Sequence, residues 1–216
     1  TGSLLLAGGT LALANNSALS FNRNTAIAAN STITSGRLAN GAGLAFTLGT
    51  LSIGAQTLTI GQGSGVTSGT AGVTFGAATL TASGATFSTG TGSQLTLASV
   101  TGTGRSFTAG GAGATTITGG ISTGTGSLTK TGTGLLTISG SSSYSGGTFI
   151  NSGTLSAGNN SALGSGEIVV DGGIFVVPTG VTMANAVKLS GGSYNRTLSG
   201  NLTGAVNATS DLGGVD

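Results

Sequence analysis

Short aliphatic runs, in which Leu, Ile or Val alternates with Thr or Ser, recur along the whole chain. Alternation with a period of two is typical of a half-buried β-strand. Gly, Thr, Ser and Asn separate the runs, and these residues favour tight turns. The pattern therefore predicts an all-β protein with strands at residues 48–53, 58–60, 95–97, 135–138, 168–170 and 174–177, among others.

Helices are not expected in any part of the chain. Glu, Lys and Arg are rare, and Gly or β-branched residues interrupt every window that could otherwise form a helix. No apolar run approaches the roughly 18–20 residues that a membrane-spanning helix needs. We therefore expect no membrane span in this segment.

Two architectures join short strands by glycine-rich corners, the β-sandwich and the β-solenoid. Sandwich hairpins favour Asn-Gly or Asp-Gly turns, which occur here only at 40–41 and 171–172. A sandwich also carries charge on its outer strand faces, whereas only 5% of this chain is charged. In a solenoid, Thr, Ser and Asn stack in ladders from one coil to the next, so the sequence favours the solenoid.

Composition excludes several other classes of protein. Disordered chains combine low hydropathy with high net charge, but the mean hydropathy is +0.38 and the net charge is +2. Collagen needs Gly at every third residue and abundant Pro, and this chain has 44 Gly and 1 Pro in 216 residues. No nucleic-acid partner is expected, because the basic residues form no dense face. They are Arg23, Arg37, Arg105, Lys130, Lys188 and Arg196.

Internal repetition points to stacked coils. Residues 9–19 read GTLALANNSAL, and residues 153–163, which lie 144 positions later, read GTLSAGNNSAL. The corner motif Thr-Gly-Thr-Gly occurs at 89–92, 101–104, 123–126 and 131–134. Coils of roughly 20 residues give about ten coils and, at about 4.8 Å per coil, a rod about 50 Å long. We expect residues 1–216 to form a single solenoid segment of a longer repetitive chain.

A longer motif, LTKTGTGLLTISGSSSYSGGTFINSGTLSAGNNSALG, occupies residues 128–164. It resembles the passenger-associated transport repeat, also called the autotransporter-associated β-strand repeat. The matching positions are Leu128, Lys130, Gly132, Gly134, Leu136, Ile138, Gly140, Tyr144, Gly146 or Gly147, Thr148, Ile150, Gly153, Leu155, Ala162, Leu163 and Gly164. Ser142 or Ser143 stands where the family has Asn. Residues 1–20 resemble the closing half of a second repeat, so we interpret the two copies of the 144-residue repeat as markers of register along the rod.

The resemblance implies a right-handed parallel β-helix in a large secreted protein of the bacterial cell surface. We therefore expect an extracellular structural β-solenoid, a segment of a surface fibre, filament or adhesin. The expected partners are further copies of the same chain, through end-to-end or lateral association or through covalent continuation into more repeats. One alternative is a passenger stem that binds cell-surface glycans, which rows of exposed aromatic residues would support.

Enzymatic activity is not expected, because the chain has no His and no Cys and only four acidic residues. The acidic residues are Glu167, Asp171, Asp211 and Asp216. In an extended strand, Glu167 and Asp171 are roughly 13 Å apart, which is too far for a paired-carboxylate mechanism. The sequence Asp171-Gly172-Gly173 matches a calcium-binding nonapeptide only loosely. We predict no catalytic, cofactor-binding or metal site.

Three further features of the sequence carry expectations. Tyr144 is expected to pack where the chain turns, with its ring over the edge of a coil. Lys130 is expected to project to solvent or to cap a corner carbonyl, with its stem on apolar surface. Thr-x-Thr pairs at 57–59, 79–81 and 116–118 raise ice binding as a second alternative. The spacing of these pairs along the sequence is irregular, which favours Thr as a strand and ladder residue instead.

Overall fold

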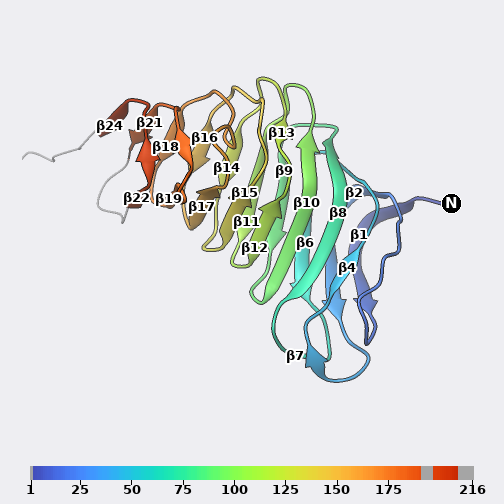
Figure 1. The fold of residues 1–216 in the computed structure, drawn as a ribbon. Coiled ribbons are helices and arrows are strands. Elements are labelled where there is room, and N and C mark those ends of the chain that lie inside the picture. Colours follow the sequence, from blue (N-terminus) through green and yellow to red (C-terminus); the bar gives the residue numbers. More distant parts are fainter. Residues whose placement is uncertain (1, 191–196, 209–216) are drawn as a thin grey trace, which may run out of the picture.

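The computed structural model of the chain is a β-solenoid of parallel strands (Figure 1). It describes residues 2–190 and 197–208. The strands of the described part pair in parallel, and the chain completes about nine turns. The same residues form no helix, and hence none that could cross a membrane. The predicted all-β parallel β-helix of about ten coils is confirmed, with about nine turns.

The strands stack on three faces, named A, B and C, which each turn of the chain visits in that order. Face A contains the first halves of β1 (Leu4–Ala14) and β2 (Thr25–Gly36), β5 (Leu51–Ile53), the second halves of β8 (Ala71–Leu80) and β10 (Ser93–Thr101), β13 (Ile121–Ser122), β20 (Thr182–Met183) and β23 (Asn201–Leu202). Face B contains the second halves of β1 and β2, β6 (Thr57–Gln62), β9 (Ala85–Thr89), β11 (Phe107–Gly111), β14 (Leu128–Lys130), β16 (Thr148–Ile150), β18 (Ile168–Val170), β21 (Val187–Leu189) and β24 (Val206–Ala208). Face C contains β4 (Ala45–Thr47), the first halves of β8 and β10, β12 (Ala114–Ile117), β15 (Leu135–Ile138), β17 (Thr154–Ala157), β19 (Ile174–Val176) and β22 (Thr197–Ser199).

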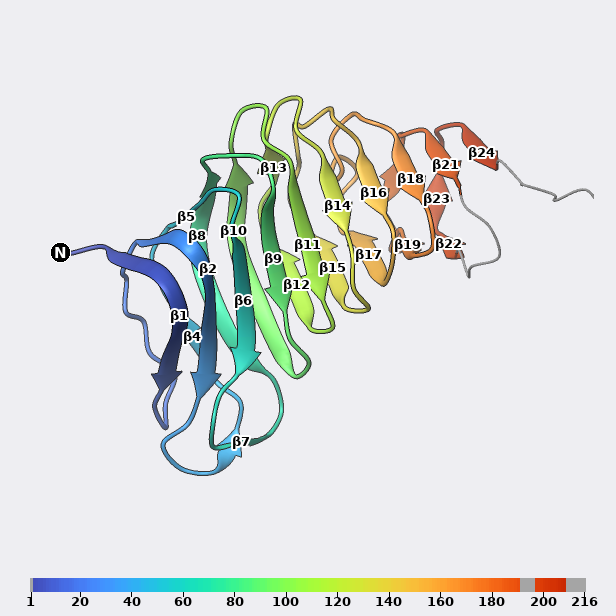
Figure 2. The same cartoon turned by 180° about the vertical axis from the view of Figure 1, so that it is seen from behind.

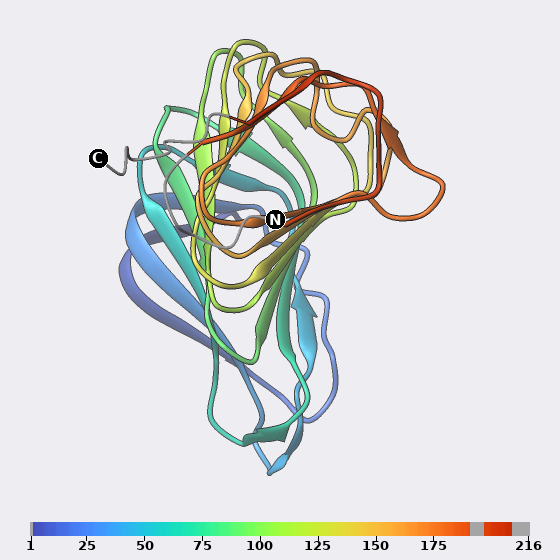
Figure 3. The same ribbon diagram turned by 90° about the vertical axis from the view of Figure 1, so that its left-hand side faces the viewer.

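Coils 2 and 3 are longer than the other coils. We number them from the N-terminus, with coils 1 to 9 beginning at residues 4, 25, 51, 78, 99, 121, 142, 161 and 182. Ser31 pairs with Leu58, 27 positions later, whereas Leu128 pairs with Thr148, 20 positions later. Figure 2 shows long strands at the N-terminal end and short ones toward the C-terminus, and Figure 3 shows the matching decrease in cross-section. The expected coil length of roughly 20 residues therefore fits the other coils but not coils 2 and 3.

A small two-stranded sheet protrudes from the corner between faces B and C in coils 2 and 3. Its strands, β3 (Gly41–Ala42) and β7 (Val66–Ser68), pair only with each other and lie at the lower edge of Figure 1. The Arg37 guanidinium holds the first of these loops, because it donates hydrogen bonds to the carbonyls of Ala39 (3.2 Å), Ala42 (2.9 Å) and Asn16 (3.2 Å). These insertions account for the greater length of coils 2 and 3.

The core consists of columns of inward side chains. Parallel pairing places equivalent residues of successive coils above one another, and every second residue of a strand points inward. The column on face C is Phe46, Val73, Leu95, Thr115, Leu136, Leu155 and Phe175, all buried. Its one polar member, Thr115, is satisfied inside the core, since its hydroxyl lies 2.8 Å from the hydroxyl of Thr89.

Identical sequence segments occupy different places in the coil. The first GTL, at residues 9–11, lies on face B in β1, whereas the second, at 153–155, leads into β17 on face C. The interpretation of the two copies as markers of register is therefore wrong, and the 144-residue period itself stays a prediction. Thr-Gly-Thr-Gly likewise turns from face B to face C at 89–92 and from face A to face B at 123–126. These motifs encode a tight turn, which any corner can use.

Candidate functional site

The passenger-like segment, residues 128–164, winds through coils 6 and 7 into coil 8. On face B, β14 stacks on β16, and on face C, β15 stacks on β17. Its closing residues Ala162 and Leu163 are buried at the start of coil 8. The segment thus comprises two stacked coils, and its distinctive polar residues, Lys130 and Tyr144, lie close to their corners.

Lys130 points into the solenoid. It stands in the inward column of face B between Ala109 and Ile150, and its side chain is only 2% exposed. Its ammonium group donates hydrogen bonds to the carbonyls of Thr131 (2.7 Å) and Gly132 (2.9 Å), and to that of Ser152 in the next coil (3.3 Å). The partners of this buried cation are backbone dipoles, and one of them belongs to a different coil.

The expectation for Lys130 is half correct. The capping of corner carbonyls is confirmed, but the projection to solvent is wrong. Because Leu128 points inward, a period of two places Lys130 inward as well, and the sequence already contained that signal. Burial lowers the pKa of Lys130 from 10.5 to about 8, since desolvation disfavours the charged form. Lys130 therefore links coil 6 to coil 7. Its three hydrogen bonds offset the free-energy cost of burying the charged ammonium group.

Tyr144 is fully buried, and its hydroxyl lies 2.5 Å from the Thr148 hydroxyl, which is also buried. Burial raises the pKa of Tyr144 above its ordinary value. Its packing role agrees with expectation, but the ring lies inside the core and not over a coil edge. The reason is that the phenol finds an internal partner four residues later, so the whole side chain leaves solvent.

Tyr144→Phe is expected to lower the free energy of unfolding by about 1–2 kcal/mol, because it leaves the buried Thr148 hydroxyl without its partner. Thr148→Val is expected to do the same to the phenol. The double variant should be more stable than the sum of the two losses predicts, since neither polar group then remains. Urea denaturation of the four proteins measures this coupling, and strictly additive losses would contradict the pair.

The acidic residues form no site in the described part of the chain. Glu167 and Asp171 are exposed and flank the two ends of β18. No group of three His, Cys, Asp or Glu side chains that could hold a metal ion occurs among the described residues. Asp211, Asp216 and Arg196 lie outside them.

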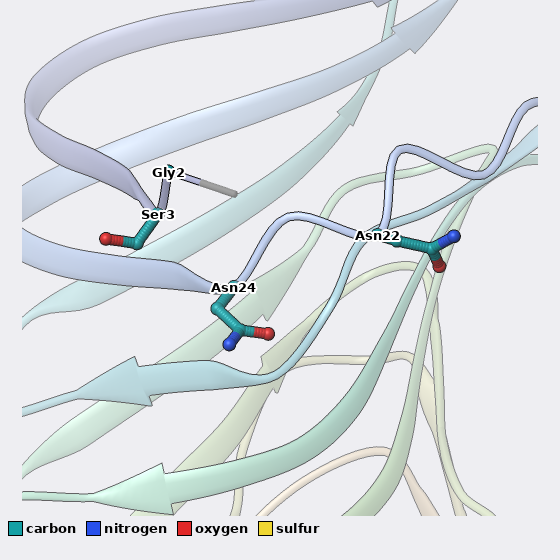
Figure 4. A pocket seen from close by; sticks show the side chains of 4 residues that line it. All are labelled: Gly2, Ser3, Asn22 and Asn24. Atoms are coloured by element: carbon teal, nitrogen blue, oxygen red, sulfur yellow. The ribbon is translucent and has the colours of Figure 1, made fainter.

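Two shallow hollows are lined by amides and hydroxyls. Figure 4 shows the one formed by Gly2, Ser3, Asn22 and Asn24 at the N-terminal end. The amide oxygen of Asn24 there already accepts the Thr50 N–H at 3.0 Å. The second is lined by Asn160, Ser161, Gly164, Ser165, Ala184 and Asn185. Asn185 donates both of its described side-chain bonds to corner carbonyls within the solenoid. No titratable side chain lines either hollow, so neither offers general acid–base chemistry.

Hydroxyl ladders run along the outside of the rod. We name the longest, on face C, the threonine ridge. It consists of Thr47, Thr74, Thr96, Thr116, Thr137 and Ser156, one from each of coils 2 to 7. A second ladder on face A includes Thr79 and Thr101, whose hydroxyls are 3.5 Å apart, and Ser122 and Ser143, whose hydroxyls are 3.3 Å apart. The ladders expected from the composition are present.

Their spacing along the sequence does not predict how well the Thr and Ser residues of the ladders align. The Thr-x-Thr pairs at 57–59, 79–81 and 116–118 are irregularly spaced because they lie on faces B, A and C, respectively. Strand pairing nevertheless keeps Thr74, Thr96 and Thr116 in one column. Exposed aromatic residues show no such alignment in the described part. Phe21 and Phe149, each 38% exposed, lie in coils 1 and 7 on different faces. The row of aromatic side chains that would support glycan binding is therefore absent there.

One comparison with known proteins gives a match, which covers part of the chain. Residues 128–157 match the model of the family described as passenger-associated-transport-repeat. No curated protein and no solved structure matches the chain. The match spans β14 to β17, the two stacked coils that contain Lys130 and Tyr144. The chain is a β-solenoid that carries a passenger-associated transport repeat.

Proposed function

We propose that this chain is the structural stem of a secreted passenger protein, an extracellular rod within a bacterial surface fibre or adhesin. The observation that carries the proposal is the continuity of the stacked columns from coil to coil around a passenger repeat. In this role the chain associates with further copies of itself, end to end or side by side, and performs no chemistry.

The physical properties of the rod support this role. In the interior of the stack each strand is hydrogen-bonded on both edges, so little free edge is left for unspecific pairing. Cohesion comes from apolar columns and backbone bonds, and only 5% of the residues are charged. Salt screens exposed charges but leaves buried contacts nearly unaffected. Such a rod keeps its shape when the ionic strength outside a cell changes.

Removal of one coil in register tests whether the chain works as a stem. Phe107 pairs with Leu128, so deletion of residues 108–128 joins Phe107 directly to Thr129 and preserves the order of the faces. We expect the solenoid to remain folded and the rod to shorten by about 4.8 Å. Small-angle X-ray scattering measures the length, and circular dichroism measures the β-structure.

The control for this experiment is a deletion that breaks the register. Removal of residues 108–117 joins face B to the end of face C, so the strands that follow lose their partners. This variant is expected to unfold at much lower denaturant concentration. If the in-register deletion instead abolished a discrete ligand-binding or enzymatic activity of the chain, that result would contradict a purely structural stem.

A further inference from the structure

The outer surface of face C is made of three parallel rows. The threonine ridge forms the middle row. In coils 2 to 5, Ala45, Gly72, Gln94 and Ala114 form the row on one side, and Gly49, Gly76, Ala98 and Thr118 form the row on the other. Most of the flanking side chains are smaller than Thr, so the ridge stands between two shallow furrows.

This surface carries no charge over six coils. The face C segments at residues 45–49, 72–76, 94–98, 114–118, 135–139 and 154–158 contain no Lys, Arg, Asp or Glu. The ridge side chains are partly exposed, so a partner can reach them. A face without charge does not repel a second copy of itself, and charged rods would have to overcome that repulsion.

We propose that face C is the lateral interface between two copies of this chain. The inference rests on the proposed structural role and names the face that performs the association. The ridge of one copy seats in a furrow of the other, as side chains interdigitate between packed β-sheets. Both copies have the same spacing between strands, so a contact formed in one coil recurs in each successive coil.

The size of face C sets the expected strength of the contact. Six coils at about 4.8 Å and a width of five residues at about 3.3 Å give about 475 Å² per copy. The total of about 950 Å² lies just below the lower limit for specific interfaces. We therefore expect weak association of this chain alone and stronger association of longer rods, in which many coils act together.

Paired substitutions on two faces test the proposal. Thr96→Lys with Thr116→Lys places two charges in the middle of the ridge. Thr86→Lys with Thr108→Lys places the same charges in an outward column of face B, where these residues also stack. In sedimentation velocity over a wide concentration range, we expect the face C variant to associate at least tenfold more weakly than the unmodified chain. The face B variant should associate normally.

A charge-reversed variant separates a lost interface from a lost fold. Thr96→Glu with Thr116→Glu is also expected to associate weakly by itself, whereas an equimolar mixture of the Lys and Glu face C variants should regain association. A monodisperse unmodified chain at every concentration, or equal weakening by the face B variant, overturns the proposal. So does thermal hysteresis that only the face C variant loses, which would assign the ridge to ice. In each of these cases, a rod length that X-ray scattering finds unchanged would leave the proposed function as a structural stem standing.

Discussion

Gly132→Ala is expected to lower the free energy of unfolding by more than about 4 kcal/mol, the largest effect of any substitution considered for this chain. Gly132 has φ +68°, a conformation that costs Ala about 1–2 kcal/mol. In addition, a Cβ atom there would lie 2.4 Å from the carbonyl oxygen of Gly111 in the preceding coil. The Gly111 oxygen accepts the Gly134 N–H, and the Cβ atom is fixed to the backbone of Gly132, so the contact is relieved only if coils 5 and 6 separate. Urea denaturation measures the loss.

Gly180→Ala is the matched control for this substitution. Gly180 also has a positive φ, +85°, but a Cβ atom at that position meets nothing within 4 Å. The free energy of unfolding should therefore fall by only about 1–2 kcal/mol, which is what a positive φ costs Ala. If the two variants lost equal stability, the close approach of coils at the Gly132 corner would contribute nothing, and the explanation for its glycine would fail.

The fold follows from two local signals in the sequence. The period-two alternation placed strands at residues 135–138 and 168–170, which are the bounds of β15 and β18. The glycine-rich corners and the scarcity of charge distinguished the solenoid from the sandwich. These signals are local because each strand points one set of side chains into a shared core, whatever the length of the corner that follows.

Corner length is the property that local signals leave undetermined. An insertion at a corner lies outside the stacked strands, so it changes neither the pairing nor the alternation. The protruding β3 and β7 and the length of coils 2 and 3 were missed for this reason. The alignment of the threonine ridge was missed as well, since it depends on which residues of distant coils pair. Lys130 is a different case, because its inward direction follows from that of Leu128, two residues earlier in the same strand.

Lys130→Met is expected to lower the free energy of unfolding by about 2 kcal/mol at neutral pH. Met fills the inward column, so the change mainly removes the three hydrogen bonds to the carbonyls of Thr131, Gly132 and Ser152. Hydrogen bonds from a charged donor contribute about 1.5–3 kcal/mol each. Their sum exceeds the cost of burying the ammonium group, which a pKa lowered from 10.5 to about 8 puts at about 3 kcal/mol. A Met variant as stable as the unmodified chain would contradict this balance.

The pH dependence of the two proteins isolates the contribution of Lys130. The pKa of Lys130 is about 8 in the folded chain and 10.5 in the unfolded chain, so between these values the unfolded state binds more protons. Stability of the unmodified chain should therefore rise from about pH 8 and level off near pH 10.5, by at most about 3 kcal/mol. A neutral amine still donates two hydrogen bonds to the carbonyls, so deprotonation removes the desolvation cost and keeps most of the contact. Lys130→Met lacks this group, and its deficit relative to the unmodified chain should widen across the same interval. A constant difference from pH 7 to pH 11 would show that the buried amine does not titrate there.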